Sequence, residues 1–214
     1  MAGWEYVANA KPNPAHEALV ALEQAQILSL LVTQNVDRLH QRAGHQQVID
    51  LHGRLDRVTC LNCRENIERA QLQTRLEALN PHYQQTLAEI RPDGDAEVAD
   101  AVVAAFQVPD CEQCGGLLMP DVVFFGGSVP LPRIERISAA IAAADALLVA
   151  GSSLMVFSGF RFARQAVALG KPLVIINRGA TRADDLATVK YSADCAATLS
   201  YLASKLGNAS SSVL

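Results

Sequence analysis

The chain has 214 residues and a net charge of −4, and half of its residues are apolar while 19% are charged. This size fits one large domain or a large domain carrying a small one, and the apolar share argues against wholesale disorder. The acidic balance argues against nucleic acid as the main ligand, since phosphate binding needs a basic face. No apolar run approaches the about 18 residues of a membrane span, and the N-terminus lacks a secretory signal, so we expect a cytoplasmic protein.

The first predicted element is a helix that starts at Asn13 and Pro14, because asparagine caps helices and proline fits their first turn. Apolar residues then recur at helical spacing at Ala15, Ala18, Leu19 and Leu22. The segment ILSLLVT (Ile27 to Thr33) follows, a short apolar run typical of a strand buried on both faces. Three more such runs are predicted strands: Val122 to Phe125, Ala146 to Ala150 and Leu173 to Ile176.

Helical patterns alternate with the last three strands. One carries Ile134, Ile137 and Ile141, and the next carries Phe160, Ala163 and Val167 and ends at Gly170 and Pro172. A final helix is predicted at Leu199, Leu202 and Leu206, before a frayed tail from Asn208. Buried strands that alternate with helices predict an α/β fold with a doubly wound, Rossmann-like parallel sheet.

The five cysteines give the most specific pattern. Two C-x-x-C pairs and one isolated residue occur, in the order Cys60, Cys63, Cys111, Cys114 and Cys195. In a reducing compartment, paired cysteines suggest a metal before disulfides. Two such pairs supply the four thiolates of a tetrahedral zinc site, and four protein ligands make that zinc structural rather than catalytic. Four unrelated buried thiols, or a redox pair, remain the alternatives.

The stretch between the cysteine pairs interrupts the strand–helix alternation. It is more polar, holds two weak helical patterns (Leu72 to Leu79 and Val98 to Phe106) and contains a turn at RPDGD. We therefore expect residues 58–118 to form a zinc-binding module with a helical insert. Residues 1–57 and 119–207 would be the two parts of the Rossmann-like domain, and residues 208–214 a flexible tail.

Polar segments follow the predicted strands, where doubly wound sheets bind ligands. TQNVDRLHQRAG (Thr33 to Gly44) offers Gln34, Asn35 and Asp37, whose groups suit ribose hydroxyls and a carboxamide. AGSSLMVFSG (Ala150 to Gly159) and the triplet after Ile176 suit a phosphate or ribose. Ordinary strand-to-helix turns explain these segments about equally well, and the absence of G-x-x-x-x-G-K-[ST] argues against a P-loop enzyme.

DLHGR (Asp50 to Arg54) offers a candidate base. His52 can accept a proton near neutral pH, and Gly53 lets a ligand approach the backbone. A structural histidine is the alternative, and the pattern gives less support to the remaining histidines, which are His16, His40, His45 and His82.

Taken in order, TQNVDRLHQRAG, LHG, the two C-x-x-C pairs, CGGLLMPDVVFFGG, GSSLMVFSG and INRGATRADDLA resemble the sirtuin family from about Ala2 to Leu206. The long insert, FQVPDC and TRADDLA look most like class II. The resemblance implies an NAD-dependent protein-lysine deacylase that transfers the acyl group to ADP-ribose and releases nicotinamide. Its partners would be acyl-lysine side chains of proteins, with no nucleic acid or membrane, and the oligomeric state stays open.

The resemblance also implies residue roles. The catalytic residues would be His52, as the base, and Asn35. The residues that contact NAD would be Gln34, Asn35, Val36, Asp37, Gly151, Ser152, Ser153, Asn177, Arg178, Gly179 and, through its backbone, Cys195. The zinc ligands would be Cys60, Cys63, Cys111 and Cys114. Substrate peptide would pair as a strand with Val123 to Gly127 and Met155 to Ser158.

Three departures from the family accompany the resemblance. Met119 and Gly127 stand where relatives usually carry a basic residue and an acidic or polar one. The family's first strand and its G-A-G-x-S loop would precede Met1, so we expect this chain to lack them and to bind NAD weakly. An inactive remnant or binding module is therefore one alternative, and lipoamidase or mono-ADP-ribosyltransferase specificity is another.

Overall fold

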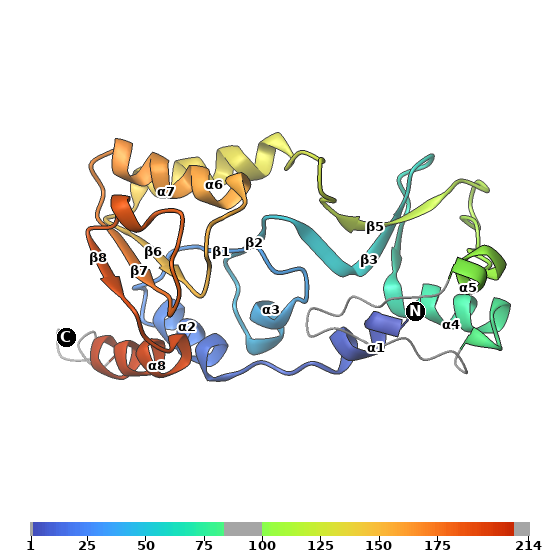
Figure 1. The fold of residues 1–214 in the computed structure, drawn as a ribbon, viewed down its shortest axis with the longest axis horizontal. Coiled ribbons are helices and arrows are strands. Elements are labelled where there is room, and N and C mark those ends of the chain that lie inside the picture. The colour runs from blue at the N-terminus through green and yellow to red at the C-terminus, as the bar shows by residue number, and fades with distance from the viewer. Residues whose placement is uncertain (1, 84–99, 208–214) are drawn as a thin grey trace. The chain divides into compact units, whose positions relative to one another are not determined.

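The computed structural model describes residues 2–83 and 100–207 (Figure 1). The chain divides into two compact units. Unit 1 comprises Met1–Lys11, Val36–Arg38 and Gly53–Val122, and unit 2 comprises Pro12–Asn35, Leu39–His52 and Val123–Leu214.

Unit 2 contains parallel strands in two sheets. One sheet pairs β1 (Leu31–Thr33) with β2 (Val48–Asp50). The other has the order β6 (Leu147–Ala150), β7 (Leu173–Ile176) and β8 (Val189–Tyr191). The predicted α/β class with parallel strands is confirmed, although the described strands of this unit form two sheets rather than one.

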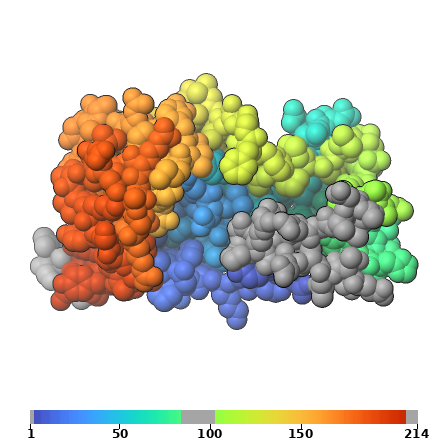
Figure 2. Space-filling view, viewed as in Figure 1, coloured from blue at the N-terminus to red at the C-terminus, as the bar shows by residue number. Residues whose placement is uncertain are grey.

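Helices cover both faces of the β6–β7–β8 sheet. The helical segments of unit 2 are α2 (Pro14–Gln24), α3 (Leu39–Ala43), α6 (Leu131–Ala143), α7 (Phe157–Ala168), the 3-10 turn η2 (Asp184–Leu186) and α8 (Cys195–Leu206). Figure 1 shows α6 and α7 on one side of the sheet and α2 and α8 on the other. Because both faces are covered, the central strand β7 buries Leu173, Ile175 and Ile176 almost completely. The C-terminal part of unit 2, which includes α8, is red in Figure 2, and Tyr201 and Lys205 of α8 are exposed.

The predicted start of α2 is confirmed in detail. The Asn13 side chain accepts hydrogen bonds from the backbone N–H groups of Ala15 (3.0 Å) and His16 (3.3 Å), and Pro14 occupies the first helical position. The backbone N–H of Asn13 in turn reaches Nδ1 of His16 at 3.2 Å, so the cap is reciprocal. Ala18 and Leu22 then face the core.

Two predicted strands need correction. In ILSLLVT only the last three residues form a strand, because the backbone N–H groups of Ile27 and Leu28 still close the end of α2 on the carbonyl of Leu22. Ile27 is consequently 44% exposed. The strand predicted at VVFF lies earlier in the chain, as β5 (Leu118–Val122), and Phe125 is fully exposed at 101%. The prediction of both strands from apolar composition alone was therefore wrong in their bounds.

Unit 1 is built on an antiparallel sheet in which β3 (Gly53–Cys60) pairs with β4 (Asn66–Glu68) and β5. Its helices are α1 (Ala2–Asn9), α4 (Arg69–Leu79) and α5 (Asp100–Ala105). The first weak helical pattern corresponds to α4, whereas Val98 and the RPDGD turn lie outside the described residues. Val58, Leu72 and Leu76 form the buried core. Within the two described ranges, no helix is long and apolar enough to span a membrane.

Gly53 begins β3 in a conformation that only glycine adopts freely. Its φ is +87°, and a Cβ there would lie 2.1 Å from the backbone oxygen of Asp121. The close approach of β3 to β5 at this point therefore requires glycine. This structural requirement within unit 1 explains Gly53 without a ligand.

Three histidines of unit 2 join α2 to α3 and the turn after it. The ring centroids of His16 and His40 are 4.6 Å apart, and those of His40 and His45 are 5.7 Å apart. The fully buried His45 side chain places Nδ1 3.2 Å from Oε2 of Glu23. Burial, and then the neighbouring His16 and His45, lower the pKa of His40 to about 4.

We expect this cluster to make unit 2 sensitive to acid. His40 takes up a proton near pH 6.5 when the chain is unfolded but only near pH 4 when it is folded. Below about pH 6.5 the unfolded chain therefore binds more protons than the folded chain, and the free energy of unfolding decreases as the pH falls toward 4. The measurement is the free energy of unfolding between these two pH values. His40→Gln should lose less stability over this interval than wild type or the exposed control His82→Gln. Parallel losses in all three proteins would contradict the expectation.

Candidate active site and metal centre

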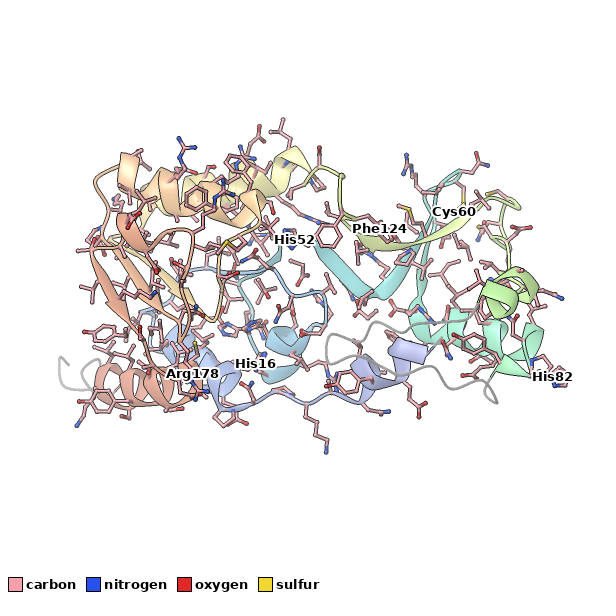
Figure 3. All side chains as sticks on the ribbon, in the orientation of Figure 1. His16, His52, Cys60, His82, Phe124 and Arg178 are labelled. Carbon is pink, nitrogen blue, oxygen red and sulfur yellow. The ribbon has the colours of Figure 1, made fainter. Side chains whose placement is uncertain are left out.

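The carboxyl ends of the parallel strands in unit 2 carry the predicted polar residues. Gln34 directly follows β1, and His52 follows β2 by two residues. The two strand ends are held together because the backbone N–H of Leu51 donates to the carbonyl of Thr33 at 2.9 Å. The backbone of His52 is fixed as well, since its carbonyl accepts from the N–H of Val123 at 2.8 Å. Figure 3 labels His52 at this position.

Both imidazole nitrogens of His52 have partners. Nδ1 lies 3.0 Å from the backbone oxygen of Gln34, and Nε2 lies 2.7 Å from Oγ of Ser158. A carbonyl oxygen only accepts, so Nδ1 carries the proton and Nε2 holds the lone pair in the neutral ring. Nε2 therefore accepts a hydrogen bond from the Ser158 hydroxyl and is the atom available to act as a base.

The side chain of Gln34 is held by the first turn after β6. Its Nε2 donates to Oγ of Ser152 at 2.7 Å, and that oxygen also accepts from the backbone N–H of Leu154 at 3.2 Å. Gly159 packs against the same amide: a Cβ at Gly159 would lie 2.8 Å from Oε1 of Gln34. The segments after β1 and β6 thus form one hydrogen-bonded group with α7.

The ends of β6 and β7 meet the start of α8. Gly151, at φ +63°, donates its N–H to the carbonyl of Ile176 at 2.9 Å. The Cys195 thiol donates to the same carbonyl at 3.2 Å, and burial raises its pKa, which keeps it neutral. The Cys195 thiol therefore already has a hydrogen-bond partner inside unit 2, so a ligand contact there would involve the backbone of Cys195.

A polar group follows β7. Nδ2 of Asn177 donates to the carbonyl of Gly179 at 2.9 Å and so shapes the turn. Arg178 is exposed and forms an ion pair with Asp194 at 2.7 Å. Asp194 also caps α8 through the N–H of Ala197, the main reason why its pKa is lowered. The turn is thus preformed, with a cation at its surface.

The structure brings most of the predicted NAD-contacting residues to one edge of unit 2. Asn35 and Ser153 are exposed beside Gln34 and Ser152 respectively. Val36 and Asp37 belong to unit 1, where the carbonyl of Val36 accepts from the N–H of Leu55 at 2.9 Å. These two residues are therefore part of unit 1 and not of this edge of unit 2.

Ser158 is the site residue whose side-chain role the sequence interpretation missed. Ser158 ends the segment predicted to pair with substrate peptide, and that prediction gives its hydroxyl no role. The available signal was its place in GSSLMVFSG, a polar segment after a strand that already offered ligand-binding groups. Its partner, however, lies 106 residues away in the chain.

The four predicted zinc ligands lie together in unit 1. The sulfur atoms of Cys60, Cys63, Cys111 and Cys114 all lie within 4.8 Å of one another. Sγ of Cys60 is 3.5 Å from that of Cys114, and Sγ of Cys63 is 3.8 Å from that of Cys111. Tetrahedral zinc with Zn–S bonds of about 2.3 Å separates its sulfurs by about 3.8 Å, so the cluster fits this ion.

Each C-x-x-C pair ends in a left-handed turn that directs the two sulfurs to one point. Arg64, after Cys63, has φ +65° and its N–H reaches the carbonyl of Cys60 at 3.1 Å. Gly115, after Cys114, has φ +68° and its N–H reaches the carbonyl of Cys111 at 2.8 Å. The two turns are equivalent, which is what a symmetric four-sulfur site requires.

The ionisation of the four cysteine thiols also favours a bound metal ion. A hydrogen bond from the Asn62 side chain, with one from the N–H of Gly116, lowers the pKa of Cys114 to about 6. The N–H of Glu65 lowers the pKa of Cys63, but Cys114, burial and the other sulfurs raise it to about 12. The sulfurs are too close to ionise together unless a cation balances them.

The fold and the two sites define a protein with two compact units. One is Rossmann-like, with polar residues at the carboxyl ends of its parallel strands, and the other holds a cluster of four cysteines. The sequence profile of the Sir2 family matches residues 2–158. The chain therefore belongs to the Sir2 family, as predicted.

Relatives and solved structures agree with this assignment. An NAD-dependent protein deacetylase of Xanthomonas campestris pv. campestris (strain 8004) is 52% identical over 202 residues, which cover 94% of this chain and 69% of that protein. A structure of Sir2 with a p53 peptide and NAD+ is 32% identical, with a TM-score of 0.77, and the match covers 95% of this chain and 73% of that one. Sir2 bound to acetylated peptide gives a TM-score of 0.77 at 31% identity, covering 94% and 73%.

Proposed function

We propose that this chain is an NAD-dependent protein-lysine deacylase. The family and the name of its relatives support the reaction type. The single structural observation that carries the proposal is His52, whose Nδ1–H is held by the Gln34 carbonyl so that the Nε2 lone pair is available. A base held in one tautomer at the carboxyl ends of parallel strands is the arrangement that this chemistry needs.

NAD, when bound, supplies the ADP-ribose that accepts the acyl group and the nicotinamide that leaves. His52 takes the proton of a ribose hydroxyl onto Nε2, which makes that oxygen the nucleophile. Gln34, fixed by Ser152, and Asn35 orient the ribose and the nicotinamide. The catalytic role of Asn35 is to position the substrate, because a side-chain amide does not ionise near neutral pH and acts only as a hydrogen-bond donor and acceptor.

The rest of the NAD would follow the ends of β6 and β7. Gly151, Ser152 and Ser153 offer a glycine turn and hydroxyl groups to a phosphate or ribose. The preformed turn of Asn177, Arg178 and Gly179 offers amide, cationic and backbone groups to the adenosine ribose. The backbone of Cys195 at the start of α8 would contact the adenine, because its thiol is already used.

Acyl-lysine peptide is the proposed second substrate. Sir2 structures with peptide substrates are similar to this chain. The segments that would pair with the peptide backbone, 123–127 and 155–158, lie outside the regular strands and expose the large apolar side chains of Phe124, Phe125 and Met155. Exposed apolar side chains on segments that lie outside the sheets suit an extended peptide that adds a strand.

The test is product stoichiometry with an acetyl-lysine peptide and NAD. We expect free lysine peptide, nicotinamide and O-acetyl-ADP-ribose in equal amounts, and none of them without NAD. ADP-ribose attached to protein, with the acetyl group left in place, would instead show mono-ADP-ribosyl transfer. Deacetylation in the absence of NAD would contradict the proposal outright.

A further inference from the structure

The transfer of a proton from a ribose hydroxyl to His52 does not by itself require the hydrogen bond between His52 and Ser158. Oγ of Ser158 lies 2.7 Å from Nε2, the same atom that must take the proton. Ser158 stands in the first turn of α7 and is half-buried. A hydroxyl that already occupies the lone pair of the base must either move aside or take part.

A serine hydroxyl suits both protonation states of the ring. It is one donor and also an acceptor, so it donates to Nε2 of neutral imidazole and accepts from Nε2–H of imidazolium. A carbonyl oxygen would serve only the protonated ring, and an N–H group only the neutral ring. The chain thus places beside the base a group that can remain its partner while the charge changes.

The serine is also held firmly in place. The next residue, Gly159, is buried and packs against the side chain of Gln34, whose backbone oxygen binds Nδ1 of the same imidazole. Rotation of the ring would therefore break hydrogen bonds on both sides. α7 and the segment after β1 together determine the plane in which the lone pair of His52 lies.

We propose that Ser158 is a positioning residue for His52, an inference that rests on the proposed function. In the resting protein its hydroxyl donates to Nε2 and orients the ring. The ribose hydroxyl then replaces it on the lone pair; the ribose O–H bond breaks, the proton joins Nε2, and the electron pair stays on the ribose oxygen as the nucleophile. Ser158 then accepts the new Nε2–H and stabilises the imidazolium until its proton passes to the lysine amine, which leaves as the ribose oxygen takes over the acyl group.

The kinetic test uses Ser158→Ala. We expect kcat to fall about tenfold, the value of one hydrogen bond to a charged group, while KM for NAD changes by less than about twofold. Ser158→Thr keeps the hydroxyl and should restore most of kcat, and Ser200→Ala, an exposed serine of α8, is the matched control. A rise in KM with unchanged kcat, or an inactive Ser158→Thr alongside an active Ser158→Ala, would overturn the proposal.

A spectroscopic test separates this inference from the proposed function, because it needs no activity. In ¹⁵N-histidine-labelled protein with a neutral ring, His52 should show a protonated Nδ1 and an Nε2 shifted by an accepted hydrogen bond. Ser158→Ala should move the Nε2 signal toward that of a free lone pair and leave Nδ1 protonated, whereas Ser158→Thr should not. A wild-type Nε2 that carries the proton, or an Nε2 signal unmoved by Ser158→Ala, would refute the contact even if the chain proves inactive.

Discussion

Replacing His52 with asparagine should lower the rate of deacylation by at least about 10²-fold, because general base catalysis contributes that much to the chemical step. Asparagine tests the role of the base more specifically than alanine does. Its Nδ2–H can still donate to the carbonyl of Gln34, which the wild-type Nδ1–H satisfies at 3.0 Å, so this carbonyl is not left without a donor. Single-turnover rates with acetyl-lysine peptide measure the effect.

The affinity for NAD should change little in the same variant, since a base acts on the reaction step more than on ground-state binding. His82→Asn, an exposed histidine of unit 1, should leave both the rate and the affinity unchanged. If His52→Asn turned over near the wild-type rate, His52 would be a structural histidine. A parallel loss of NAD binding and of the unfolding transition would mean that the residue supports the fold instead.

The second large effect is expected from the cysteine cluster. Wild-type protein should hold one zinc per chain, and Cys60→Ser should lose it, because Cys60 is fully buried and one of only four ligands. Structural zinc in comparable sites contributes about 10–16 kcal/mol, which is similar in size to the about 5–15 kcal/mol net stability of a typical domain. Unit 1 should therefore unfold when the metal is lost.

Metal analysis together with limited proteolysis checks this expectation, with cleavage in Gly53–Val122 as the sign that unit 1 has unfolded. Cys195→Ser is the matched control, because its thiol bonds to the carbonyl of Ile176 in unit 2 and lies outside the cluster. An equal loss of zinc from Cys195→Ser would contradict the ligand assignment. So would wild-type protein that contains no zinc and still resists protease.

The sequence alone determined those features that depend on neighbouring residues. The cap at Asn13 follows from asparagine before proline, and it formed as expected because every group involved lies within one helical turn. The cysteine ligands followed from the two C-x-x-C pairs, since each pair directs its sulfurs through a local turn. Strands β6 and β7 were also predicted correctly, because both are short apolar runs of the kind expected for parallel strands between helices.

Strand placement at the surface of the units was decided by tertiary structure. β3 was missed because GRLDRVTC has polar residues at positions that an antiparallel sheet leaves partly exposed. The VVFF run is apolar but not buried, so its composition predicted a strand that lies earlier in the chain, at Leu118–Val122. Apolar residues are buried in a core only on average. Their presence in a segment does not show whether the side chains of that segment point to the core or to solvent.

The chemistry of the candidate base was likewise beyond the sequence. LHG offered His52 as one histidine among five, and the family resemblance selected it, but neither identified the atom that acts. That atom is assigned by two hydrogen bonds, to residues 18 and 106 positions away. Contacts of this length arise only when separate strands and helices pack together, so local residue patterns determine the elements, whereas the tautomer of His52 and the place of Ser158 are set by the packed fold.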